Sequence, residues 1–182
     1  LNGLKNVSIE RIISEIYAMA KNNKFTKAIE SLNDLGISEN VFGLNLNTNL
    51  QEIWSQDKKT AFVFIYFPIK KIKSLPIPKN AKMYLDVNQT KYDDVIKNYC
   101  FIWTRFHSIE KANIFLEIYN YLNKKNIEIN AKEVPINYEL LDLFDNKEKG
   151  KVIMLMRYFS LINVEINYEN ILNYINKEKS IN

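Results

Sequence analysis

Few residues of this 182-residue chain have the types and spacing that site chemistry requires. Zinc sites are built from clustered cysteine and histidine ligands, but the chain has only one residue of each type, Cys100 and His107. Two neighbouring carboxylates, Asp93 and Asp94, could hold a divalent cation, but adjacent side chains of a helix point about 100° apart. We therefore predict no metal site, and we expect the two aspartates to lie on a solvated face.

Motifs for nucleotide binding and nucleophilic catalysis are also missing. The four glycines form neither a phosphate-binding loop nor a nucleophile elbow. Cys100 lies in the apolar run of residues 99–103, which favours a small buried hydrophobic side chain. His107 follows Phe106 in a position typical of a histidine near a helix end. We predict no catalytic residue.

Clustered lysines are the remaining candidates, because they attract anions such as phosphate groups. One cluster surrounds Gly150 and precedes an expected helix, whose free N–H groups and dipole would add to the attraction. The other lies in a basic, extended connection over residues 70–82. Lysine-rich loops in a lysine-biased protein are usually just solvated surface, so for each cluster a phosphate contact and a solvated surface both stay open. The candidate phosphate-contacting residues are Lys147, Lys149, Lys151, Lys70, Lys71 and Lys73.

The composition of the chain indicates a folded helical protein. Hydrophobic residues make up 47% of the sequence, enough for one sizeable core or two small ones. Glycine and proline number four each, too few for the tight turns of an all-β protein. The net charge of +4 and the pI near 8.9 are compatible with a nucleic-acid partner but do not require one. The abundance of lysine, asparagine and isoleucine is typical of an AT-rich genome, and we assign it no function.

Apolar runs and cysteine content bear on the location of the protein. The longest apolar run, residues 61–67, stops at Pro68 and is too short to cross a membrane. A single cysteine allows no disulfide framework, which suits a reducing compartment. We therefore expect a cytoplasmic protein with no membrane partner. The sequence starts with Leu1 rather than methionine, and we expect it to be a fragment.

The start of the chain carries the clearest helix signal. Ser8 is a good N-cap, and Glu10 lies in the first turn, where the helix dipole favours negative charge. Arg11 and Glu15 are four residues apart and can form an ion pair. The apolar residues expected to share a buried face are Ile9, Ile12, Ile13, Ile16 and Ala20.

A second helix is expected to pair with the first in a helical hairpin. Thr26 can cap this second helix, and Gly36 can end it in the left-handed conformation. After a short helix near residues 50–54, residues 61–67 could be a buried helix or a buried strand, and we predict a helix because no partner strand is evident. The apolar face of the second helix should contain Phe25, Ala28, Ile29, Leu32 and Leu35.

Another helical hairpin is expected after the basic connection. Thr90 can cap a helix that runs to about residue 106, and Ser108 can cap its partner. The sequence therefore predicts an all-α fold, a bundle of successive helical hairpins. Shorter helices should follow over about residues 138–144, 151–161 and 168–175, and the partner helix should bury Ile109, Ala112, Phe115, Leu116, Tyr119 and Leu122.

Residues 8–15, which read Ser-x-Glu-Arg-Ile-x-x-Glu, resemble the neck motif of bacterial-type class II tRNA nucleotidyltransferases, the family of CCA-adding enzymes and poly(A) polymerases. A looser resemblance to the tail region of that family covers residues 136–141, the helix after Gly150 and residues 169–172. The tail of the family usually carries glycine and aspartate where this chain has Tyr138 and Glu139.

The resemblance implies an elongated neck, body and tail, which here would be residues 1–45, 46–130 and 131–182. In the family a catalytic head precedes the neck, and the whole enzyme uses Mg²⁺ with CTP or ATP. None of the head motifs is in this sequence, so the resemblance implies no cofactor for this chain and no activity from this chain alone. It implies a helical portion that supports an absent head and binds tRNA through phosphate and shape contacts.

Within this resemblance, the four polar neck residues would fix the geometry of the neck rather than take part in chemistry. The lysine clusters would be the candidate RNA-binding residues. An ordinary capped amphipathic helix can carry the same residue types by chance, so a second function stays open, a helical protein–protein interaction module with no RNA role. The four neck residues are Ser8, Glu10, Arg11 and Glu15.

Overall fold

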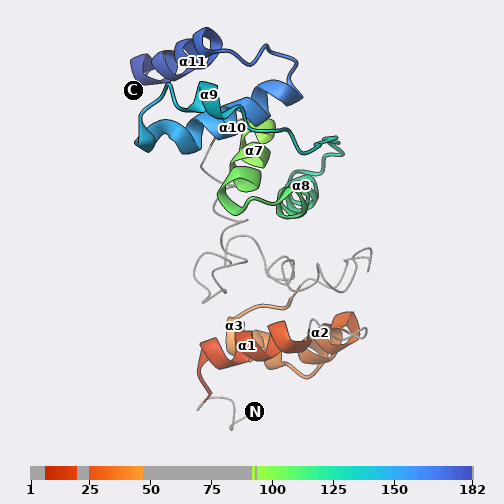
Figure 1. Ribbon diagram of the computed structural model, residues 1–182. Helices are drawn as coiled ribbons and strands as arrows, with labels where there is room; N and C mark the ends of the chain where they lie inside the picture. Colours follow the sequence, from red (N-terminus) through yellow and green to blue (C-terminus); the bar gives the residue numbers. More distant parts are fainter. Residues whose placement is uncertain (1–6, 20–24, 47–91, 93, 182) are drawn as a thin grey trace. The chain divides into compact units, whose positions relative to one another are not determined.

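The computed structural model describes residues 7–19, 25–46, 92 and 94–181. In these residues every regular element is a helix, which confirms the all-α prediction (Figure 1). The chain divides into two compact units, residues 1–85 and 86–182. No helix in the described ranges is long and apolar enough to cross a membrane. The expected helices near residues 50–54 and 61–67, the basic connection and Thr90 lie outside the described residues.

Helix α1 (Ile9–Met19) starts as the sequence predicts. Ser8 Oγ accepts a hydrogen bond from the backbone N–H of Arg11 at 3.3 Å, which confirms the N-cap. Ile13 and Ile16 are almost fully buried, as expected for the apolar face. Ile9 is exposed, so the buried face of α1 is narrower than the sequence pattern suggests.

Helix α2 (Phe25–Asp34) buries Ile29 completely, as predicted. The helix already includes Phe25, so Thr26 lies inside its first turn and the predicted cap at Thr26 is wrong. Leu35 is 65% exposed, and its predicted place on the buried face is also wrong. The reason is that Leu35 follows the last helical residue and belongs to the turn that leaves the helix.

Gly36 lies between two helices and has a role in both. Its φ of 72° is the left-handed conformation that was predicted for the end of α2, and glycine adopts it without steric strain. Its carbonyl oxygen also accepts from the N–H of Asn40 in helix α3 (Ile37–Phe42). Helix α3 was not predicted, because the six residues are too few for a clear apolar period.

An asparagine side chain holds the segment after α3 against α2. Asn33 Nδ2 donates to the carbonyl oxygen of Leu46 at 2.8 Å, and Asn33 Oδ1 accepts from the N–H of Leu46 at 2.9 Å. In the second unit Asn120 binds the backbone of Ile127 in the same way, at 3.0 and 3.1 Å. The amide provides one donor and one acceptor, so it satisfies both backbone groups of a residue that has no helical partner.

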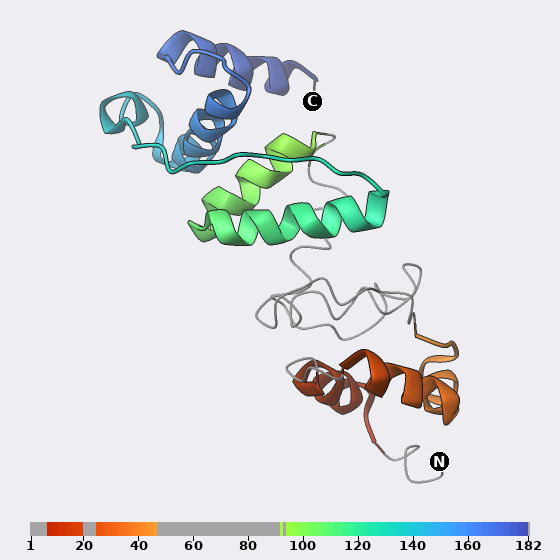
Figure 2. The ribbon, with the colours of Figure 1, turned by 90° about the vertical axis from the view of Figure 1, so that its right-hand side faces the viewer.

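The second unit is built around helix α7 (Val95–Phe106), which packs against α8 (Ile109–Asn123) and α10 (Lys149–Leu161) (Figure 2). The pairing of α7 with α8 confirms the predicted hairpin. Its core is formed by side chains from all three helices. The fully or almost fully buried ones include Tyr99, Cys100, Ile102, Trp103, Ala112, Phe115, Ile118, Val152 and Leu155.

The helix ends in this hairpin are capped by side chains. Ser108 Oγ accepts from the N–H of Lys111 at 3.2 Å, which confirms the predicted cap of α8. Helix α7 begins at Val95, later than the sequence suggested, because Asp94 Oδ1 accepts from the N–H of Ile96 at 2.8 Å. His107 is the left-handed C-cap of α7, with φ of 50°, which agrees with a histidine near a helix end.

The last third of the chain contains α9 (Tyr138–Leu141), a 3₁₀ helix (Asn146–Glu148) and α11 (Tyr168–Ile181) in addition to α10. All three predicted helices are present. Helix α9 is three residues shorter than expected, since the chain turns after Leu141. Helix α11 extends six residues beyond the predicted end, because its last turns make ion pairs with the region where α10 begins.

We expect Asn120→Ala to lower the free energy of unfolding by about 1–3 kcal/mol, because the N–H and C=O groups of Ile127 lose their partners. The matched control is Asn126→Ala, an exposed asparagine six residues later, which should change the free energy by less than about 0.5 kcal/mol. Urea denaturation followed by circular dichroism measures both values. If both substitutions changed the free energy of unfolding equally, the hydrogen bonds of the Asn120 amide would contribute nothing to stability.

Candidate functional site

The residues of the predicted neck motif lie at the start of α1, and most of them face solvent. Ser8 has a structural role as the N-cap. Glu10, Arg11 and Glu15 are exposed. Within residues 7–19, Arg11 and Glu15 are not joined by an ion pair, so the pairing expected from their spacing does not form. The three charged groups are therefore accessible to a partner on the surface of α1.

The lysines around Gly150 come together at the start of α10, as the sequence suggested, but two of them bind carboxylates. Lys149 Nζ lies 3.2 Å from Asp142 Oδ1. Lys151 forms an ion pair with Glu178 of α11. Lys147 is exposed in the 3₁₀ helix and has no ion-pair partner among the described residues. Only one of the three charges is thus uncompensated, and the candidates Lys70, Lys71 and Lys73 lie outside the described residues.

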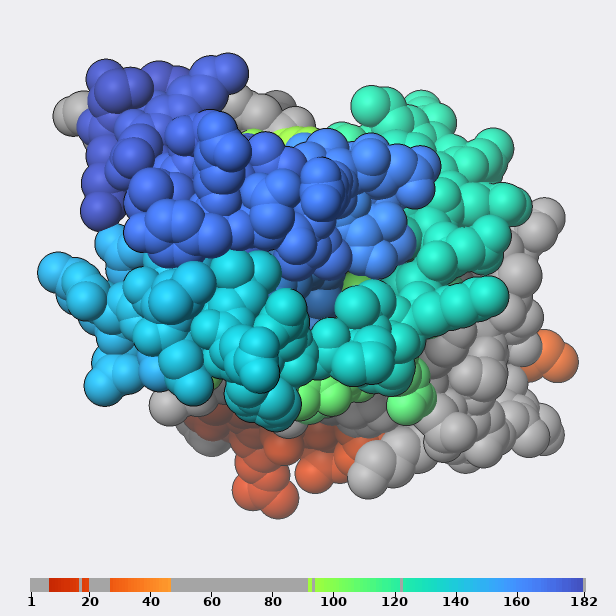
Figure 3. All heavy atoms as spheres, turned by 45° about the horizontal axis from the view of Figure 1, so that its top comes forward, coloured from red at the N-terminus to blue at the C-terminus, as the bar shows by residue number. Residues whose placement is uncertain are grey.

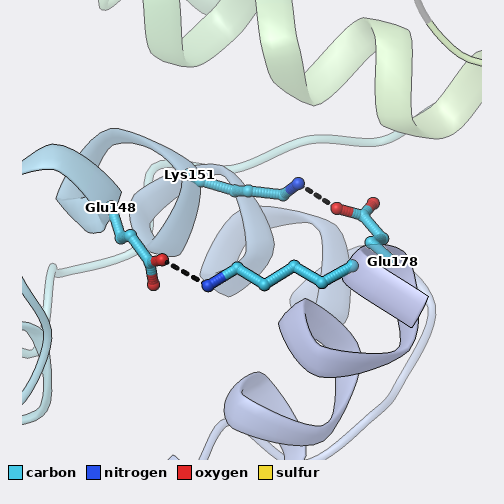
Figure 4. Close-up of polar contacts among 4 residues, drawn as sticks. Glu148, Lys151 and Glu178 are labelled. Carbon is cyan, nitrogen blue, oxygen red and sulfur yellow. Dashed lines mark hydrogen bonds and ion pairs between the residues drawn. The ribbon is translucent and has the colours of Figure 1, made fainter. Parts of the chain in front are cut away.

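Two ion pairs join the start of α10 to the end of α11 (Figure 4). Glu178 and Lys179, which are neighbours on α11, bind partners of opposite sign: Glu178 binds Lys151, and Lys179 Nζ lies 2.9 Å from Glu148 Oε1. Each segment carries one acidic and one basic residue, and each residue binds the oppositely charged residue of the other segment. This arrangement fixes the position of α11 on α10 and leaves no net charge at the contact.

The positive and negative charges also balance over residues 94–181 of the second unit. Residues 94–181 contain 12 lysines and arginines and 12 aspartates and glutamates. Residues 47–91 contain eight lysines and three acidic residues. The positive surplus of the chain is therefore not on the described helices of the second unit, and any strong electrostatic attraction of a polyanion has its main source elsewhere in the sequence.

Polar and aromatic groups meet where α7, α10 and α11 approach each other. Tyr158 donates its hydroxyl proton to Asp94 Oδ2 at 2.8 Å, and burial together with this hydrogen bond raises the pKa of Tyr158. Lys97 Nζ lies 4.7 Å from the ring centroid of Tyr174 and 5.5 Å from that of Tyr158. Asp94 is half-buried and uses both oxygens in contacts, so the expected solvated position is wrong for this residue.

The part of the chain that the structure describes contains no group of three or more histidine, cysteine, aspartate or glutamate side chains that could hold a metal ion. Asp94 already binds a backbone N–H and a tyrosine hydroxyl. Cys100 is completely buried, which confirms its predicted role as a hydrophobic side chain, and burial raises the pKa of its thiol to about 12. His107 is exposed at the end of α7.

A buried arginine is the feature that sequence analysis missed. Arg157 of α10 is only 6% exposed, and its guanidinium carbon lies 4.7 Å from the ring centroid of Trp103. Its Nη1 donates to Thr104 Oγ1 at 3.0 Å. The available signal was the rarity of arginine: the chain has three, and this one lies in the otherwise apolar run of residues 152–159.

The fold and these contacts define the class of protein only as all-α, and the chain divides into two compact units. No protein-family model, no curated protein and no solved structure matches the chain. The likeness of residues 8–15 to a nucleotidyltransferase neck therefore stays a prediction from the residues themselves.

We expect the thiol of Cys100 to resist iodoacetamide at pH 8, because the reactive species is the thiolate and the folded pKa is about 12. Since this pKa is raised on folding, the neutral thiol contributes stability that is present below about pH 9 and is lost as the pH rises toward 12. Mass spectrometry follows the labelling. The control is Ser160→Cys at an exposed site of α10, whose thiol should react quickly, and equal rates at the two sites would contradict the burial argument.

The ion pair of Lys151 with Glu178 should be measurable by a double-mutant cycle. With side chains 37% and 26% exposed, we expect Lys151→Gln and Glu178→Gln to show a coupling of about 0.5–1 kcal/mol at low salt. The coupling should fall in 1 M NaCl, where the Debye length is about 3 Å. The pair of Lys179 with Glu148 is the comparison, and its coupling should be smaller because Lys179 is more exposed. A coupling of zero for the first pair would show that α11 is held by its apolar face alone.

Proposed function

We propose that this chain is the non-catalytic helical portion of a tRNA nucleotidyltransferase-like protein, which supports a catalytic head and binds tRNA through phosphate and shape contacts. The proposal is supported mainly by the arrangement of side chains at the start of α1. Ser8 caps the helix, and three charged side chains of the neck motif face solvent beside it. A surface of this kind is suited to contact a second domain, since its charged groups are not used within the helix.

The distribution of charge indicates where tRNA phosphates would bind. Phosphate contacts need cations that are not already neutralised. Lys147 meets this condition among the lysines around Gly150, whereas Lys149 and Lys151 bind Asp142 and Glu178. Residues 47–91 contain more lysines than acidic residues, so by composition they also include cations that are not neutralised. We therefore assign the stronger phosphate contacts to the basic connection and a weaker one to Lys147.

Fluorescence anisotropy with labelled tRNA at 50 and 200 mM salt tests this function. We expect binding that weakens steeply with salt, and a salt slope that falls by about one for each phosphate contact removed. The triple substitution Lys70→Glu, Lys71→Glu and Lys73→Glu should have the larger effect, and Lys147→Glu the smaller one. Lys177→Glu, at an exposed position of α11, is the control and should leave the affinity within about twofold.

A helical protein–protein interaction module is the second candidate function. Two observations favour it: residues 94–181 have no net charge, and several large apolar side chains are exposed near α9 and the start of α11. Aromatic and aliphatic side chains of this kind are typical of the centre of protein interfaces. If the wild-type chain fails to bind tRNA at low salt, the RNA function is excluded and this candidate replaces it. The exposed apolar residues concerned are Tyr138, Leu143 and Tyr168.

A further inference from the structure

Arg157 carries a buried positive charge that forms no ion pair with a carboxylate in the described part of the chain. Its side chain makes one hydrogen bond, to Thr104, and stacks on the indole of Trp103. Burial lowers the pKa of Arg157, but a guanidinium stays protonated at neutral pH. Buried charges are normally paired, because an unpaired one loses its hydration without compensation.

Two N–H donors at this place have no partner. Arg157 Nε and Trp103 Nε1 are both buried and make no hydrogen bond. Since Nη1 is used by Thr104, the unused edge of the guanidinium is the one formed by Nε and Nη2. This edge offers two parallel N–H groups, which is the geometry that binds a carboxylate or a phosphate with two hydrogen bonds.

We propose that Arg157 and Trp103 form a binding site for a small oxyanion, a carboxylate or a phosphate group. The anion accepts from the unused edge of the Arg157 guanidinium, and the neighbouring indole N–H is a further donor. The site neutralises the buried charge and is independent of the tRNA-binding function proposed above.

Glu133 is the acidic residue whose charge acts on Arg157. It is the carboxylate that raises the pKa of Arg157 most, yet it is exposed and makes no ion pair with Arg157. It belongs to the extended segment of residues 125–137, which passes over α7 and α10 on its way from α8 to α9 (Figures 1 and 2). On the face seen in Figure 3, a small part of α7 (green) is visible between α10 (blue) and this segment (teal). Because like charges repel, we expect the carboxylate of Glu133 to lower the affinity of the site for an anion.

Nuclear magnetic resonance of the indole N–H groups tests the proposal in the full chain. Trp103→Phe assigns the Trp103 signal, because the only other tryptophan is Trp54. We expect this signal to shift and saturate during titration with inorganic phosphate or with acetate at constant ionic strength, while chloride has no effect. The two titrations distinguish a phosphate site from a carboxylate site, and absence of a saturable shift with either anion overturns the proposal.

Substitutions on both sides of the site separate specific binding from general salt effects. Arg157→Lys keeps the charge but removes the two parallel N–H donors, so we expect the affinity to fall about tenfold or more. Glu133→Gln should raise the affinity about fivefold, because a repelling charge is removed. Glu128→Gln is the control, the same chemical change at an exposed position of the same segment, and should have no effect. Unchanged affinity in both Arg157→Lys and Glu133→Gln overturns the proposal.

Discussion

The burial of α7 between α8 and α10 is the constraint on which the second unit depends. A helix that packs on two sides has little access to water, so each polar group on it needs a partner within the protein. Most of them have one: the Tyr99 hydroxyl donates to Asn113, Asn98 Nδ2 donates to the carbonyl oxygen of Tyr92, and Thr104 accepts from Arg157. The indole N–H of Trp103 has no partner, and it lies beside Arg157 of α10, whose Nε also has none.

Asparagine has a structural role in both units that its abundance does not reveal. A compositional bias explains why the residue is frequent but not where its side chains bind. In the structure asparagine amides cap helix α9, hold the turn before α11 and pair with backbone groups after α2 and α8. The amide is suited to these positions because it donates and accepts at once, without the desolvation cost of a charge.

Charge in the second unit is used between elements of the fold more than toward solvent. The lysines at the start of α10 looked like an anion site because their counter-charges are far away in the sequence. Glu178, the partner of Lys151, is 27 residues later, and Lys179 is 31 residues from Glu148. Two of the three lysines at the start of α10 are thus paired, and this part of the surface is less attractive to anions than the lysine spacing suggests.

The sequence by itself determined the all-α class, the caps at Ser8 and Ser108, and the left-handed end of α2 at Gly36. These features depend on backbone groups only a few residues away, so local residue types are enough to predict them. Tertiary structure decided which residues contact groups that are far away in the sequence. The hydrogen bond of Tyr158 to Asp94, the length of α11 and the burial of Arg157 against Trp103 all depend on groups brought together by packing, and no local spacing encodes them.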